Sequence, residues 1–131
     1  MKIMNEDWRS VEIAPFKGKV MVGSKVFAVR APDTPLQLVR GYREMVPTSD
    51  ECMIFPYHNL VNRTFTMDNC VANLLICFCI KGDRHYTCVD VKEGKIGIKE
   101  IKSSNIHDTV FEFLLESAPK LKRGSLIKLL D

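Results

Sequence analysis

The chain has 131 residues, a length that fits one compact domain. Apolar residues make up 46% of it and charged residues 27%, which is enough for a real core and ordinary for a globular protein. The formal net charge is only +3, without the dense basic stripe of a dedicated nucleic-acid binder. The composition therefore argues against nucleic acid as the partner.

Location is predicted from what the sequence lacks. No apolar run reaches the roughly 18 residues that a membrane span needs. The start, MKIMNEDWRSVEIAP, has no long apolar region and carries acids, so we do not expect a signal peptide. Five cysteines, an odd number, favour reduced thiols. We expect a cytoplasmic or virion protein that does not contact membranes.

The first predicted elements are a hairpin and a helix. Residues 19–23 and 25–31 alternate like strands, and Gly23 with Ser24 between them is typical of a two-residue turn. A helix is expected over residues 35–43. Thr34 would cap it, and Gln37 completes a T-x-x-Q capping box.

The middle of the chain is predicted to alternate between short strands and loops. Residues 52–55 read as a strand that ends at Pro56, residues 57–63 as a loop and residues 63–67 as a strand. From residue 74 to 80, both faces of the alternating pattern are apolar. We therefore expect this strand to be central and buried on both sides.

The last third is predicted to contain four more strands. Three cover residues 84–91, 95–101 and 108–116. Residues 117–124 read as a short helix that ends at Gly124, and residues 125–130 as the final strand. The pattern predicts a mainly β (α+β) fold: a small antiparallel barrel-like structure with one helix after the first hairpin and a short helical turn before the last strand. We divide the chain into a segment with the first strand, 1–24, and a barrel-like domain, 25–131.

Four of the five cysteines lie in the stretch FTMDNCVANLLICFCIKGDRHYTC, which covers residues 65–88. A structural zinc site usually takes paired ligands such as C-x2-C, and no such pair occurs. Cys77 and Cys79 share one face of a strand, with no adjacent Lys or Arg to lower a thiol pKa. We expect these residues to pack as small apolar side chains and predict no metal and no cofactor. A metal or redox site is the alternative.

No catalytic arrangement is recognisable. His85 and His107 lie on predicted strands and His58 on a loop, where a histidine is more often a surface or hydrogen-bonding residue. Cys70 is near Asp68, but no histidine is positioned beside it in the sequence, so a Cys–His nucleophile has no support. We predict no catalytic residues, and an enzyme is the less favoured interpretation.

Four segments occur in a family-like order: DTPLQLVRGYREM, CMIFPY, FTMDNCVANLLICFCIKGD and TVFEFLLESAPKLKRGSLIKL. Together they resemble the family called domain of unknown function 192 from about residue 25 to residue 130. The resemblance implies a small β-rich protein and supplies no reaction. The chain departs from the family pattern with Thr66 for tryptophan, Asp68 for lysine, Cys70 for threonine and residues 72–74 for the P-L-D motif. The matching residues are Arg40, Gly41, Met53, Phe55, Phe65, Met67, Asn69, Ala118 and Gly124.

The matched polar residues give a candidate ligand site of Arg40, Tyr57, Asp68 and Asn69. Arg40 lies on a helix that otherwise faces the core, so we expect it to pair with Asp68 or Asp33, or with an anionic ligand. Asn69 follows a strand-like run, where its amide is expected to be buried and to tie down two backbone groups. Contact with a ligand is the alternative for Asn69.

The leading segment carries Ile3 and the single tryptophan, Trp8. An exposed tryptophan would leave a large apolar surface in water, and tryptophan is enriched at interface hot spots. We predict that Trp8 is buried. A partner contact through Ile3 and Trp8 is favoured over packing on the chain's own barrel.

Two functions follow from these patterns. The first is a non-catalytic structural or interaction module that joins other protein subunits in a larger assembly, and this hypothesis extends to a viral or phage particle. The second is a small-ligand-binding protein or weak enzyme with its site near Arg40, Asp68 and Asn69. A polar cavity joining Arg40 to Asn69 favours the second, and a filled interior with an apolar surface patch favours the first.

Overall fold

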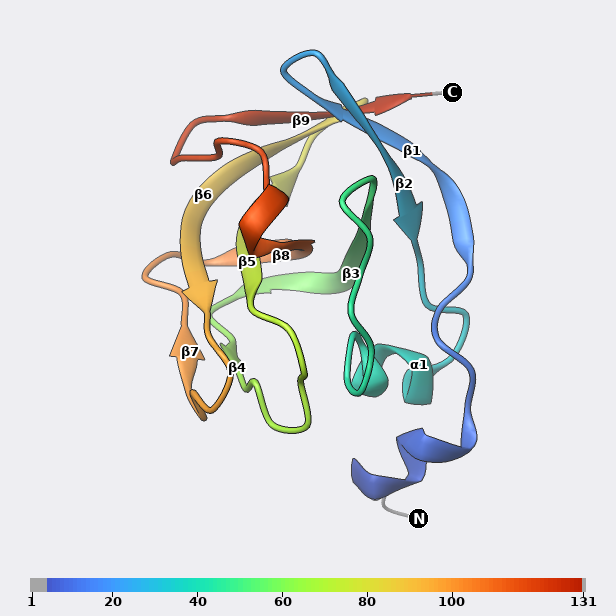
Figure 1. Cartoon of the computed structure of the whole chain (residues 1–131). Coiled ribbons are helices and arrows are strands. Elements are labelled where there is room, and N and C mark those ends of the chain that lie inside the picture. Colours follow the sequence, from blue (N-terminus) through green and yellow to red (C-terminus); the bar gives the residue numbers. More distant parts are fainter. Residues whose placement is uncertain (1–4, 131) are drawn as a thin grey trace.

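The computed structural model describes residues 5–130, and within them seven strands form a closed barrel (Figure 1). The strand order is β1-β2-β3-β8-β5-β6-β9. All pairs are antiparallel except β2 with β3. The mainly β, barrel-like prediction is confirmed. The barrel strands are β1 (Phe16–Val22), β2 (Lys25–Arg30), β3 (Glu51–Val61), β5 (Leu74–Lys81), β6 (His85–Gly94), β8 (His107–Leu114) and β9 (Leu126–Leu130).

Short elements cover one side of this barrel. Strands β4 (Thr64–Phe65) and β7 (Ile101–Lys102) pair with each other, and α1 (Pro35–Arg40) connects β2 to β3 (Figure 1). Two 3-10 helices, Asn5–Ser10 and Leu115–Ser117, complete the described elements. Between residues 5 and 130, none of the helices is long and apolar enough to cross a membrane.

The helix α1 begins as predicted but ends three residues early. The Thr34 hydroxyl accepts a hydrogen bond from the Gln37 amide at 3.2 Å, and the Gln37 side chain accepts one from the Asp33 amide at 2.7 Å. These two bonds are a capping box shifted by one residue. The helix ends at Arg40 because Gly41 has φ +52°, a left-handed conformation that glycine adopts without strain.

The loop predicted for residues 57–63 is wrong, because β3 continues through Pro56 to Val61. Strand β3 pairs with β2 only as far as Met53, and Pro56 pairs with Thr109 of β8 alone. Proline is tolerated there because no second strand needs its missing N–H. The edge position explains why Pro56 does not end the strand.

Two further predicted elements differ. Residues 95–100 do not form a strand, and all six are exposed. The helix predicted for residues 117–124 is absent from residues 118–123. The helical turn in this part of the chain is Leu115–Ser117. Residues 95–100 have no strand to pair with, whereas Ala118 and Leu121 pack against the barrel core without forming a helix.

Two apolar cores lie on opposite faces of the barrel wall. The side chains of β5 alternate between them, with Leu75, Cys77 and Cys79 inside the barrel and Leu74, Ile76 and Phe78 outside. The prediction of a strand buried on both sides is thus confirmed. The barrel core comprises Val20, Val22, Phe27, Val29, Cys52, Leu75, Cys77, Cys79, Tyr86, Cys88, Phe111, Phe113 and Ile127, and the outer core Ala14, Tyr42, Met53, Phe55, Met67, Leu74, Ile76, Phe78, Ile101 and Val110.

Trp8 is buried, as predicted, with 1% of its surface exposed. The chain's own residues cover it, and the guanidinium groups of Arg9 and Arg40 lie 4.4 and 5.7 Å from its ring centroid. A partner is therefore not needed to bury this side chain, which corrects the preference for partner contact. Ile3 lies outside the described residues.

Candidate ligand-binding site

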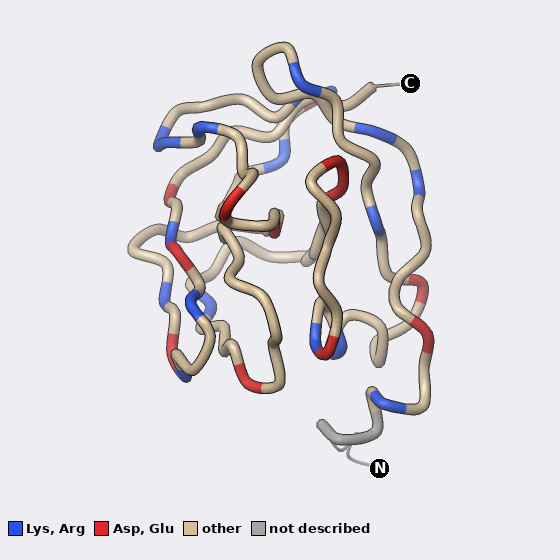
Figure 2. The backbone as a smooth tube through the Cα atoms, in the orientation of Figure 1, with Lys and Arg blue, Asp and Glu red and all other residues tan. Residues whose placement is uncertain are grey.

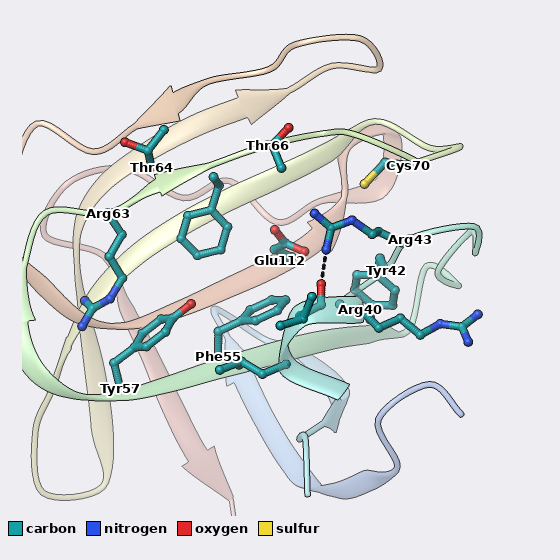
Figure 3. A pocket seen from close by; sticks show the side chains of 14 residues that line it. Arg40, Tyr42, Arg43, Phe55, Tyr57, Arg63, Thr64, Thr66, Cys70 and Glu112 are labelled. Atoms are coloured by element: carbon teal, nitrogen blue, oxygen red, sulfur yellow. Dashed lines mark hydrogen bonds between the residues drawn. The ribbon is translucent and has the colours of Figure 1, made fainter. Parts of the chain in front are cut away.

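A cavity of about 400 Å³ lies between α1 and the outer face of the barrel wall (Figure 3). The end of α1 forms one side, β3 and β8 form the floor, and the segment around β4 forms the other side. Its walls combine apolar side chains with charged and hydroxyl-bearing ones, a mixture that small-molecule sites use to orient a ligand. The lining residues are Leu38, Val39, Arg40, Gly41, Tyr42, Arg43, Phe55, Tyr57, Arg63, Thr64, Phe65, Thr66, Cys70 and Glu112.

Glu112 is the one acidic residue of this lining. Its neighbours on β8, Phe111 and Phe113, point into the barrel, so strand alternation turns Glu112 toward the cavity. Only 6% of it is exposed, and burial raises the pKa of its carboxyl group to about 8, although the charge of Arg43 opposes the rise. Glu112 is therefore mainly protonated at pH 7 and can donate a hydrogen bond.

Arg43 and Arg63 bring positive charge to opposite sides of the cavity. Arg43 follows α1, and its guanidinium group extends toward Glu112 (Figure 3). It donates to the Val39 carbonyl and, through Nε, to the Asp68 carbonyl at 3.2 Å. Arg63 lies over the Tyr57 ring, 3.8 Å from its centroid, and donates to the His107 carbonyl at 2.7 Å. Backbone acceptors thus hold both groups in place.

Tyr57 and Cys70 are neutral at physiological pH. Burial raises the pKa of Tyr57 to about 12 and that of Cys70 to about 11, and the nearby Glu112 adds to both shifts. Cys70 therefore lacks the depressed pKa of a reactive thiol. No histidine lines the cavity among the described residues, so a Cys–His pair is absent there.

The structure separates the four residues predicted to bind a ligand. Tyr57 and Arg40 line the cavity, but the Arg40 side chain points away from it (Figure 3). Its Nη1 donates to the Val11 carbonyl at 2.7 Å, so the predicted pairing with Asp68 or Asp33 is wrong. Asp68 and Asn69 are exposed and are not part of the cavity lining. Asp68 lies 3.6 Å from the Lys99 ammonium group.

Asn69 is exposed, which corrects the expectation of a buried amide. Its φ is +63°, and its carbonyl accepts a hydrogen bond from the Glu44 amide at 2.8 Å. Asparagine is one of the few residues that tolerate this left-handed conformation. The position therefore depends on backbone conformation rather than on burial.

We predict that Asn69→Ala lowers the free energy of unfolding by about 1 kcal/mol, whereas Asn69→Gly changes it by less than about 0.5 kcal/mol. Glycine adopts the positive φ freely, while alanine is strained by its Cβ. Urea denaturation of both variants checks this. Equal losses in the two variants would mean that the side chain, which accepts from Arg9 at 3.4 Å, matters more than the backbone.

Sequence reasoning missed Glu112, Arg43 and Arg63. One signal was present for Glu112, since it is a charged residue within the apolar run that covers residues 110–115. For the two arginines, no local pattern marks the direction of the side chain. Their role depends on the packing of α1 and β4 against β3 and β8.

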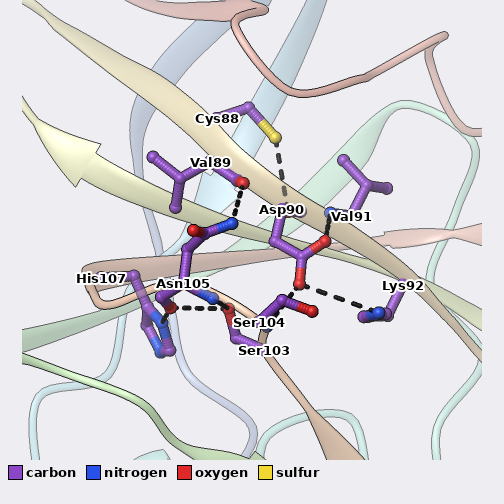
Figure 4. Close-up of polar contacts among 9 residues, drawn as sticks. All are labelled: Cys88, Val89, Asp90, Val91, Lys92, Ser103, Ser104, Asn105 and His107. Carbon is purple, nitrogen blue, oxygen red and sulfur yellow. Dashed lines mark hydrogen bonds and ion pairs between the residues drawn. The ribbon is translucent and has the colours of Figure 1, made fainter.

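A second polar group lies at the other end of β8, around His107. His107 is fully buried, packs 4.7 Å from the Phe78 ring centroid, and its Nδ1 lies 3.0 Å from the Asn105 carbonyl (Figure 4). Burial lowers the pKa of His107, so it is neutral at pH 7. Its remaining ring nitrogen, Nε2, has no hydrogen-bond partner within residues 5–130. Of the two roles expected for this histidine, its contact with the Asn105 carbonyl fits hydrogen bonding, and its burial excludes a surface position.

The barrel core contains a cluster of three cysteines. The Sγ atoms of Cys77, Cys79 and Cys88 lie within 4.8 Å of one another, and all three residues are buried. The Cys77 sulfur is 3.5 Å from that of Cys79 and 2.6 Å from that of Cys88. Sequence spacing paired Cys77 with Cys79 but could not place Cys88 of the neighbouring strand beside them.

Lys and Arg are spread around the chain rather than gathered in one stripe (Figure 2). Blue and red segments are both distributed over the backbone, and many of them lie in loops. This distribution agrees with the small net charge of +3.

No protein-family model and no curated protein matches the chain. Two solved structures are similar to it. A protein of unknown function from Novosphingobium aromaticivorans has a TM-score of 0.67 and 21% identity, with 91% of each chain covered. A protein from Sinorhizobium meliloti, proposed to be a transcription regulator, has a TM-score of 0.68 and 16% identity, over 91% of this chain and 98% of that one. At these identities the likeness shows the fold alone.

Proposed function

We propose that this protein binds a small organic acid with an apolar body in the cavity over Glu112. The observation that carries the proposal is a buried carboxyl group, with its pKa raised to about 8, on the floor of a cavity whose lining includes Arg43 and Arg63. The Arg43 and Arg63 charges favour an anionic group. Protonated Glu112 donates a hydrogen bond to a carboxylate, whereas ionised Glu112 would repel it.

The apolar part of the ligand is inferred from the walls. Leu38, Phe55 and Phe65 present apolar surface, whereas the Thr64 and Thr66 hydroxyl groups point away from the cavity (Figure 3). A cavity of about 400 Å³ is in the size range of small-molecule sites. An aromatic or branched aliphatic acid satisfies both the charge and the walls.

Benzoate is a suitable probe, with benzyl alcohol as a neutral analogue and benzylamine as a cationic one. We expect benzoate to bind with a Kd between about 10 µM and 1 mM, and the analogues at least about tenfold more weakly, because they lack the charge that Arg43 and Arg63 attract. Isothermal titration calorimetry at pH 6.5 measures all three. Equal affinity for benzoate and benzyl alcohol would contradict a site for acids.

Two variants sharpen this comparison. Arg43→Gln is expected to weaken benzoate binding by about tenfold and benzyl alcohol binding far less. Lys99→Gln is the matched control, since Lys99 is an exposed cation outside the cavity lining. A similar loss of benzoate affinity in both variants would point to general surface charge rather than to the cavity.

The second candidate is a non-catalytic module that joins other protein subunits, including those of a virion. It is favoured by a hollow of about 390 Å³ whose rim includes the exposed side chains of Val46, Val71 and Ile96. Each of these three exposes more than half of its surface, and grouped apolar side chains often mark an interface. Analytical ultracentrifugation of the wild type and of Val71→Asp tests for self-association through this surface.

Membership of the family called domain of unknown function 192 is also a proposal. It is supported by where the matching residues lie. Gly41 and Phe55 line the cavity, and Met53 and Met67 belong to the outer core beside it. Most of the matching residues therefore lie on the side of the barrel that carries the candidate site, while Ala118 packs against the barrel core.

A further inference from the structure

The three-cysteine cluster is separate from the cavity and depends on an irregularity in β6. Phe78 of β5 lies opposite Asp90 of β6, but the next residue, Cys79, lies opposite Cys88. Val89 is therefore the extra residue of a β-bulge. The bulge places Cys88 inside the barrel next to Cys77 and Cys79.

Side chains outside the barrel hold this bulge in place (Figure 4). The Asn105 side-chain amide donates to the Val89 carbonyl at 2.9 Å. The Asp90 carboxylate accepts from the amides of Val91 at 2.9 Å and Ser104 at 2.8 Å. Hydrogen bonds to Val89 and Asp90, the two residues that follow Cys88, thus fix the position of Cys88.

We propose that Cys77 and Cys88 are a peroxide-oxidisable thiol pair that forms a reversible disulfide between β5 and β6. Their sulfur atoms are 2.6 Å apart, well inside the roughly 3.5–4.0 Å at which non-bonded heavy atoms pack. Cys79 is 3.5 Å from Cys77 and is left as the third, unbridged thiol. The short separation favours a covalent pair over three independent apolar side chains.

A metal ion suits this cluster less well. Tetrahedral zinc takes four ligands at about 2.3 Å, which sets sulfur atoms well over 3 Å apart. No fourth ligand joins the three cysteines in the described part of the chain. Three thiolates around a divalent ion would also leave a negative charge in an apolar core, whereas a disulfide is neutral.

Hydrogen peroxide is the oxidant in this proposal, because it is small enough to enter where larger disulfides cannot. The Cys88 sulfur attacks one peroxide oxygen, the O–O bond breaks, and a sulfenic acid and water result. The Cys77 sulfur then attacks the Cys88 sulfur, and the hydroxyl group leaves as water with the Cys77 proton. Two thiols lose two electrons to one peroxide, which becomes two waters.

Cys88 is the first nucleophile because the neighbouring thiols stabilise its thiolate. Hydrogen bonds from Cys77 and Cys79 hold the pKa of Cys88 below its usual range, although burial opposes this. The pKa of Cys77 is raised by the same contacts and by burial, so Cys77 stays protonated until the second step. The two thiols therefore take distinct roles in one oxidation.

The test is oxidation of the folded full chain with one equivalent of hydrogen peroxide, followed by alkylation of the remaining thiols and tryptic digestion. We expect the intact mass before alkylation to fall by about 2 Da, the mass of two hydrogens. The peptide of residues 64–81 should be joined to that of residues 85–92, with fragment ions placing the bond at Cys77 and alkylation at Cys79. A phosphine reductant should reverse the link.

Alanine variants confirm the assignment. Cys77→Ala and Cys88→Ala should abolish the link, whereas Cys79→Ala and Cys52→Ala, which is buried in the same core, should keep it. A link through Cys79 in the wild type, or oxidation that stops at separate sulfinic acids, would overturn the proposal. So would stoichiometric binding of zinc by the reduced protein. If a variant does not fold, as judged by circular dichroism, the wild-type peptide map still decides.

Discussion

Glu112→Gln is expected to stabilise the protein by about 3–5 kcal/mol at pH 9 and to change its stability by less than about 1 kcal/mol at pH 5. Burial raises the pKa of Glu112 from an ordinary value of 4.5 to about 8. Between these values the folded chain binds more protons than the unfolded chain, so stability falls as pH rises through this window. Above about pH 8 the wild type has lost the full stability that ionisation of Glu112 removes. The glutamine variant does not ionise and therefore does not lose this stability.

Urea denaturation of the wild type and Glu112→Gln from pH 5 to pH 9 measures this difference. Other titrating groups are common to both proteins and cancel in the comparison. Glu116→Gln is the matched control because Glu116 is exposed and lies only four residues after Glu112 in the sequence. The difference in unfolding free energy between this variant and the wild type should not change with pH. A flat difference for Glu112→Gln as well would mean that Glu112 ionises normally and reaches water.

Glu51→Gln is expected to destabilise the protein by about 3–5 kcal/mol at pH 7, because it leaves a largely buried arginine without its counter-charge. The Glu51 carboxylate accepts from Arg30 Nε at 2.6 Å, from the Tyr42 hydroxyl at 3.0 Å and from the Thr48 amide at 3.1 Å. Only 2% of Glu51 is exposed. Burial by itself would raise its pKa, but these hydrogen bonds outweigh it and lower the pKa.

The sign of the pH effect follows from that lowered pKa. Glu51 contributes stability above its unfolded pKa, and the contribution is lost as acid protonates the folded carboxylate. Acid should therefore destabilise the wild type more than Glu51→Gln. Tyr42→Phe, which removes one hydrogen bond, should cost about 1–2 kcal/mol, and Asp50→Asn, at an exposed neighbour, less than about 0.5 kcal/mol. A loss under about 1 kcal/mol for Glu51→Gln would contradict a stabilising role for this network.

Elements whose signals are local were predictable from the sequence. The two apolar faces of β5 required burial on both sides, and the T-P-x-Q start of α1 carried its own capping groups. The hairpin of β1 and β2 likewise follows from the turn at Gly23. In each case, neighbouring residues alone decide the conformation.

Features set by pairing between distant segments were not predictable. Pro56 is compatible with β3 only because β2 ends beside it, and residues 95–100 alternate like a strand without a partner. The bulge at Val89 decides where Cys88 lies, yet the sequence of β6 contains no residue pattern that predicts a bulge. The prediction of the candidate site was wrong for the same reason. Arg40 and Arg43 are three residues apart, yet only Arg43 extends toward Glu112, while Arg40 points away from the cavity.

The most direct test of the proposed function is to locate where benzoate contacts the full chain. Amide resonances of the ¹⁵N-labelled protein would be followed in ¹H–¹⁵N spectra during a benzoate titration at pH 6.5. A site in the cavity predicts saturable shifts gathered on residues 38–43, 55, 57, 63–66, 70 and 112, which line it. Shifts gathered instead on residues 46, 71–73 and 96, or no saturable shifts at all, would contradict binding of an organic acid over Glu112.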